Sequence, residues 1–124
     1  WRPTNCNGEN QNMKVAYIFA TQRHNISYVL AKMILPQLEQ KRHGVDVVGM
    51  FFFEDNNYVL VDGNPIGARL HKVAKDTGML LMGCDQCCYE REIADKLFPG
   101  VPIGCFPDLY KALSGNMPDQ VITL

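Results

Sequence analysis

Three cysteines lie within five residues of one another, at Cys84, Cys87 and Cys88, and a fourth follows at Cys105. A C-x-x-C pair supports thiol chemistry or metal binding, because a thiolate is both a nucleophile and a soft ligand. A disulfide framework would instead spread its cysteines along the chain to join distant loops. The clustering therefore indicates a thiol or metal site.

The cysteine cluster is expected where a strand is followed by a helix. The apolar run 79–82 predicts a buried strand, and residues 85–97 predict a helix with apolar side chains at a spacing of four. Cys84 then lies at the carboxyl end of the strand, while Cys87 and Cys88 lie in the first helical turn. Cys88 is rotated about a third of a turn from Cys87, and we expect it to face the core.

Two opposing effects act on the pKa of these thiols. Unpaired N–H groups and the positive end of a helix dipole favour the thiolate of Cys84 or Cys87. The carboxylate of Asp85 favours the thiol instead. The sequence leaves the sign of the net shift open.

Two further residues are expected at the same edge of the sheet, and together with Cys88 they are the auxiliary candidates of the site. Cys105 ends a predicted strand at 101–105, and His24 lies in a predicted polar loop at 21–25. If the strands that end at Cys84 and Cys105 are neighbours, the two thiols share one edge of the sheet.

Elsewhere the chain alternates between apolar runs typical of buried strands and segments with helical spacing. This alternation predicts right-handed crossovers and a mostly parallel sheet covered on both faces, with functional groups at the carboxyl ends of the strands. Pro36 interrupts the first helical pattern and is expected to loosen it near Lys32. The predicted strands are 13–20, 45–53, 79–82, 101–105 and 120–124; the predicted helices are 26–43, 65–78, 85–97 and 107–113, with a turn at 54–57 and a short extended piece at 58–61.

Composition narrows the class of protein. The 12 basic and 13 acidic residues give a net charge of −1 with no basic run, so nucleic-acid binding is not expected. No apolar stretch reaches the roughly 20 residues that a membrane span needs. The chain lacks the glycine fingerprint of dinucleotide sites and the G-x-x-x-x-G-K-[ST] phosphate loop, and we expect no cofactor.

The 124 residues divide into a polar segment at 1–12 and a single predicted domain at 13–124. The first segment is rich in asparagine, and we expect a flexible extension or an artificial remnant, with the natural start at or near Met13. It has no apolar run of the kind that a signal peptide requires, so we expect a cytoplasmic protein with reduced thiols.

Residues 13–124 resemble the DsrE/DsrF-like family of small sulfur-relay proteins. The resemblance lies in G-C-D-Q-C-C-Y-E-R at 83–91, in M-F-F-F-E-D-N-N-Y at 50–58, and in the opening strand, loop and helix. It implies a three-layer α/β/α sandwich with a five-stranded parallel sheet, assembled into trimers or hexamers. It also implies a persulfide-carrying cysteine at Cys84, with Cys87 at the position of a second cysteine found in some members.

These observations lead to one main hypothesis and two alternatives. The main hypothesis is a cytoplasmic sulfur carrier that takes sulfur from a protein donor and passes it to a protein acceptor, with Cys84 holding the persulfide and Cys87 resolving it. One alternative is a zinc-type module at Cys84, Cys87 and Cys105, completed by Cys88 or His24. The other is a non-catalytic interaction subunit of an oligomer.

Overall fold

The computed structural model describes residues 12–124 and arranges five strands in one all-parallel sheet, in the order β4-β3-β2-β1-β5. The predicted fold class is therefore confirmed. Segment 1–11 of the proposed N-terminal extension lies outside the described residues. The strands are β1 (Lys14–Phe19), β2 (Asp46–Phe52), β3 (Leu80–Cys84), β4 (Ile103–Gly104) and β5 (Gln120–Thr123).

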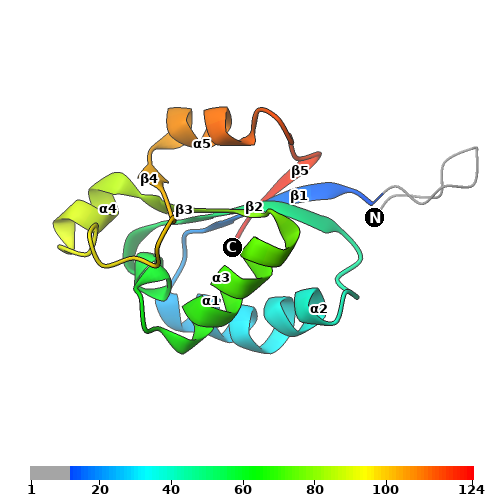
Figure 1. Cartoon of the computed structure of the whole chain (residues 1–124), viewed down its shortest axis with the longest axis horizontal. Coiled ribbons are helices and arrows are strands. Elements are labelled where there is room, and N and C mark those ends of the chain that lie inside the picture. Colours follow the sequence, from blue (N-terminus) through cyan, green and yellow to red (C-terminus); the bar gives the residue numbers. More distant parts are fainter. Residues whose placement is uncertain (1–11) are drawn as a thin grey trace, which may run out of the picture.

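Helices cover both faces of this sheet, but unequally. Figure 1 shows α1, α2 and α3 on one face and α5 on the other, with α4 beside the end of the sheet near β3 and β4. None of the helices within residues 12–124 is both long and apolar enough to cross a membrane. The helical elements are α1 (Arg23–Val29), the π-helical turn η1 (Leu30–Ile34), α2 (Leu35–Glu39), the 3-10 helix η2 (Glu54–Leu60), α3 (Pro65–Thr77), α4 (Asp85–Glu90) and α5 (Phe106–Leu113).

The core divides into two clusters, one on each face of the sheet, because successive strand side chains point to opposite faces. Phe19, Leu30 and Leu70 belong to the cluster beneath α1, η1 and α3. Phe51 and Leu109 belong to the smaller cluster beneath α5. Cys84 is a member of the smaller cluster, so the thiol site borders the face of the sheet that α5 covers.

Local sequence signals set several element boundaries. Asn64 caps α3, since its side-chain oxygen accepts hydrogen bonds from the N–H groups of Ile66 at 3.0 Å and Gly67 at 3.1 Å. Gly78 ends α3 with a φ of 78°, a left-handed value that glycine adopts without strain. Pro36 has no N–H to donate to the preceding turn, and η1 is the loosened segment predicted near Lys32.

The segment after β2 differs from the prediction. The predicted turn at 54–57 is only the start of η2, which continues to Leu60, so residues 58–60 of the expected extended piece are helical. Val61 alone is extended, and it forms an isolated β-bridge with Leu97. Asn56 and Asn57 are fully buried there, and their side-chain amides donate to backbone carbonyl oxygens.

Two other elements are shorter than predicted. The helix expected at 85–97 ends at Glu90, and Glu92 has a left-handed φ of 57°, which breaks helical geometry. The strand expected at 101–105 is reduced to the two residues of β4, since Pro102 has no N–H for a sheet ladder.

Candidate functional site

Cys84 and Cys87 come together where β3 is followed by α4. Cys84 is the last residue of β3 and the N-cap of α4, and its Sγ accepts the backbone N–H of Cys87 at 3.4 Å. The Sγ of Cys87 accepts the backbone N–H of Glu54, the first residue of η2, at 3.3 Å. Both cysteines are free thiols. The expected placement of the pair at the carboxyl end of a strand is thus observed.

The environment of Cys84 favours the thiol over the thiolate. Its exposed fraction is 7%, and it packs in the cluster with Phe51 and Leu109. Burial, and next the hydrogen bond to the side chain of Cys87, raise the pKa of Cys84 to about 11. Helix α4 has only six residues, and its N–H groups do not offset this desolvation. Burial therefore decides the direction of the pKa shift of Cys84, which the sequence left open.

Cys88 faces the interior, as expected from its rotation relative to Cys87. Its side chain is fully buried, and its S–H donates to Oδ1 of Asn57 at 3.4 Å. Burial is the main cause that raises the pKa of Cys88 to about 11, followed by the charges of Cys84 and Cys87. Cys88 is therefore a protonated core thiol at neutral pH.

Asn57 joins the thiol region to η2. Its Oδ1 accepts the backbone N–H of Cys84 at 3.1 Å as well as the S–H of Cys88. Its Nδ2 donates to the carbonyl oxygen of Glu54 at 2.9 Å. One buried amide therefore fixes the end of β3 and the beginning of η2 relative to each other. Sequence reasoning assigned Asn57 to a turn and missed this role.

Arg91 forms a second link between α4 and η2. Its Nε donates to Asp55 at 2.9 Å and its Nη2 to Glu54 at 3.0 Å, while its Nη1 donates to the carbonyl oxygen of Cys87 at 3.2 Å. The hydrogen bond to Asp55 is the largest cause that raises the pKa of Arg91 above its ordinary value. The guanidinium thus holds the two acidic side chains against the helix that carries Cys87.

The two auxiliary candidates lie apart from this network. β3 and β4 are neighbours as expected, but Cys105 is exposed and caps α5 through reciprocal hydrogen bonds with Asp108. His24 is not in a loop, because α1 begins at Arg23, and its side chain is exposed. Within residues 12–124 no hydrogen bond joins either side chain to Cys84 or Cys87.

The zinc alternative depends on three or four ligands converging. In the described part of the chain, no group of three or more His, Cys, Asp or Glu side chains is arranged to hold a metal ion. Cys105 serves as a helix cap, whereas Cys84 lies in the core. The arrangement therefore gives no support to a metal site at Cys84, Cys87 and Cys105.

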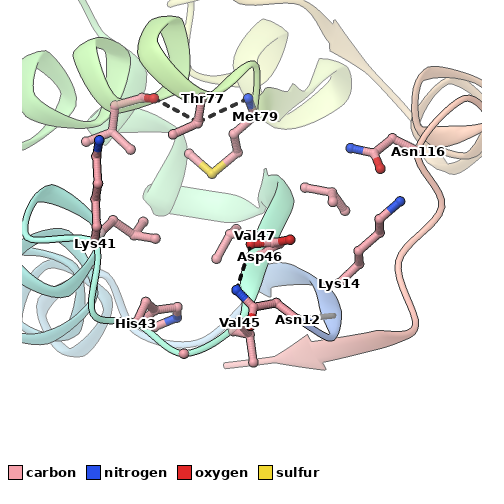
Figure 2. A pocket seen from close by; sticks show the side chains of 14 residues that line it. Asn12, Lys14, Lys41, His43, Val45, Asp46, Val47, Thr77, Met79 and Asn116 are labelled. Carbon is pink, nitrogen blue, oxygen red and sulfur yellow. Dashed lines mark hydrogen bonds between the residues drawn. The ribbon is translucent and has the colours of Figure 1, made fainter. Parts of the chain in front are cut away.

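A separate cavity of about 480 Å³ lies at the opposite end of the sheet, where Lys14 begins β1 and Asp46 begins β2 (Figure 2). His43 lines it, and its two ring nitrogens hydrogen-bond to the Tyr17 hydroxyl at 2.9 Å and to Gln37 at 2.8 Å. Burial lowers the pKa of His43. None of the described cysteines lines this cavity, so it is not part of the thiol site.

Comparison with known proteins identifies the fold. No family model and no curated protein matches the sequence. The structure is similar to the crystal structure of the ychN protein from E. coli, with a TM-score of 0.63 and 20% identity over 92% of this chain and 100% of that one. It is also similar to MTH1491 from Methanobacterium thermoautotrophicum, a protein of unknown function, with a TM-score of 0.62, 10% identity and the same coverage. These likenesses show the fold.

Proposed function

We propose that this chain is a sulfur-relay protein of the DsrE/DsrF-like type, with Cys84 and Cys87 as its sulfur-carrying pair. The observation that carries the proposal is the pair itself. Two free thiols lie together where a parallel strand ends, with the backbone N–H of Cys87 donating to the sulfur of Cys84, and this is the edge where open α/β sheets bind ligands. The YchN-like fold is compatible with this role.

The chemistry that suits the pair is transfer of a sulfane sulfur. A thiolate of the pair attacks the outer sulfur of a donor persulfide, a new S–S bond forms, the donor S–S bond breaks, and the donor thiolate leaves. No net oxidation occurs. An acceptor thiolate then takes the outer sulfur in the same way. Alternatively, the second thiol of the pair attacks the sulfur-bearing cysteine, expels hydrosulfide and leaves a disulfide, which a dithiol reductant restores.

The partners of the relay are protein cysteines, one as donor and one as acceptor, and we place the relay in the cytoplasm because it requires reduced thiols. A homo-oligomer, a trimer or a hexamer, is part of the same proposal. Exposed apolar side chains along α5 and β5 support it, since large exposed apolar patches commonly mark interfaces. They are Phe106, Tyr110, Met117, Val121 and Ile122.

The proposal is tested by incubating the reduced chain with glutathione persulfide and mapping the product by mass spectrometry. We expect the mass of one sulfur atom on the Cys84–Cys87 pair, and none in the double variant Cys84→Ala/Cys87→Ala. Cys105→Ala is the matched control and should load as the wild type does, because Cys105 lies outside the network of the pair. Sulfur on Cys105 alone, or on no cysteine, contradicts the proposal.

A further inference from the structure

We infer that Cys87, and not Cys84, is the thiol that attacks the sulfur donor, with Cys84 acting second from the interior. This inference rests on the proposed function and specifies the order of the two cysteines within it. The order is the reverse of the one expected from the sequence, where Cys84 held the persulfide.

Accessibility separates the two thiols. Cys87 is only partly buried, whereas the exposed fraction of Cys84 is 7% and its sulfur lies in the apolar cluster beneath α5. The Sγ of Cys84 also accepts the N–H of Cys87, so the backbone of the outer cysteine adjoins the inner sulfur. A donor protein that approaches the edge of the sheet therefore reaches Cys87 before Cys84.

A hydrogen bond also holds the Cys87 sulfur in place at the edge of the sheet. Its Sγ accepts a hydrogen bond from the N–H of Glu54. This hydrogen bond is stronger when the sulfur is negatively charged, as a thiolate or a perthiolate. Glu54 has a left-handed φ of 53°, a conformation that is strained for a residue other than glycine. This φ sets the direction of the N–H, so the contacts that hold it determine the donor geometry.

Two side chains hold Glu54 in this conformation, and we assign both as positioning residues. Asn57 donates to its carbonyl oxygen at 2.9 Å, and Arg91 donates to its carboxylate at 3.0 Å. Arg91 also donates to the carbonyl oxygen of Cys87, so it fixes the donor and the nucleophile together. Neither side chain touches the reacting sulfur.

Cys84 is suited to the second step. Burial raises the pKa of Cys84, so it stays protonated while Cys87 reacts. Its sulfur then attacks the Sγ of the Cys87 perthiolate, a Cys84–Cys87 disulfide forms, and the outer sulfur leaves as hydrosulfide with the proton from Cys84. A dithiol reductant returns the pair to two thiols.

The order is tested on the reduced chain with limiting iodoacetamide at pH 7.5, without any sulfur donor. Trypsin releases Cys84, Cys87 and Cys88 on the peptide 76–91, and fragment ions assign the modified cysteine. A pKa of about 11 in place of 9.0 lowers the Cys84 thiolate population about a hundredfold, and its higher intrinsic nucleophilicity returns about tenfold of that. Because the Cys87 sulfur is also the more accessible of the two, we expect Cys87 to react several-fold faster than Cys84. Equal rates, or a faster Cys84, overturn the order.

The positioning role is tested with Arg91→Gln and its matched control Arg69→Gln. Arg69 makes equivalent contacts far from the thiols, to Glu39 at 2.7 Å and to the carbonyl oxygen of Ala31 at 3.3 Å. We expect Arg91→Gln to slow Cys87 alkylation several-fold, Arg91→Lys to restore part of that rate because it keeps a cationic donor, and Arg69→Gln to leave the rate unchanged. Equal Cys87 alkylation rates in the wild type and Arg91→Gln overturn the assignment.

These tests separate the inference from the proposed function. Alkylation needs no sulfur donor, so the order of reactivity is measured even if no persulfide forms. A chain in which Cys87 reacts first but takes up no sulfur would refute the relay alone. A chain that loads sulfur on Cys84, and still does so in Cys87→Ala, would refute the order while the relay remains.

Discussion

The buried thiols predict that the protein loses stability at alkaline pH. Burial raises the pKa of Cys88 from 9.0 to about 11. Between these two values the unfolded chain releases the thiol proton while the folded chain keeps it. The folded state is then the one that binds more protons, so the free energy of unfolding is fully retained below pH 9 and falls as pH rises toward 11.

The size of the loss follows from the two pKa values. One thiol with pKa values of 9.0 unfolded and about 11 folded contributes a decrease of about 1 kcal/mol between pH 8 and pH 10. The decrease approaches about 3 kcal/mol when both pKa values have been passed. Burial also raises the pKa of Tyr17, which adds a loss of the same sign at higher pH.

Urea unfolding at pH 8, 9 and 10 under a phosphine reductant measures this loss. Cys88→Ala should unfold at a lower urea concentration at every pH, but its pH-dependent loss between pH 8 and pH 10 should be smaller than that of the wild type by about 1 kcal/mol. Cys105→Ala is the control and should keep the wild-type slope, because Cys105 is exposed. Parallel curves for the wild type and Cys88→Ala would refute the reasoning.

Three other substitutions test the packing around the site. Gly83→Ala would place a Cβ 2.6 Å from Oδ1 of Asn57, so we expect a loss of about 1–3 kcal/mol in urea unfolding, whereas Gly115→Ala, with open space around it, should lose far less. Asn64→Ala removes the acceptor for two N–H groups of α3 and should cost about 1 kcal/mol, seen as a lower thermal midpoint. Leu70→Ala truncates a fully buried side chain and should cost about 2–5 kcal/mol; a loss below 1 kcal/mol would contradict its place in the core.

The strands were predictable because their signal is local and strong. Apolar runs at 13–20, 45–53 and 79–82 contain the observed β1, β2 and most of β3, since strands buried on both faces have few polar residues. The same pattern placed Cys84 at the carboxyl end of β3. Asn64 and Gly78 marked the two ends of α3 because each satisfies a specific backbone requirement there.

The contacts that distinguish Cys84 from Cys87 were not predictable in the same way. Asn56 and Asn57 lie beside an acidic pair that is typical of a solvated turn, and only tertiary structure buries them against the ends of β1 and β3. The signal that remains in the sequence is two adjacent asparagines directly after a buried strand. Such a pair can satisfy backbone groups at the edge of a sheet.

The short length of β4 has a consequence for the inner thiol. Only two residues of β4 pair with β3, Ile103 with Gly83 and Gly104 with Cys84. Few backbone hydrogen bonds therefore hold this edge of the sheet. Sub-global opening of such a border costs less free energy than unfolding the central strands. Brief detachment of β4 would break the hydrogen bond from the N–H of Gly83 to the carbonyl oxygen of Pro102, which measures 3.1 Å, while β1 and β2 stay paired. The amide hydrogen of Gly83 should therefore exchange with solvent earlier than those of the central strands. The fold thereby buries the sulfur of Cys84 and places it next to a strand pairing of only two residues, which opens at low free-energy cost.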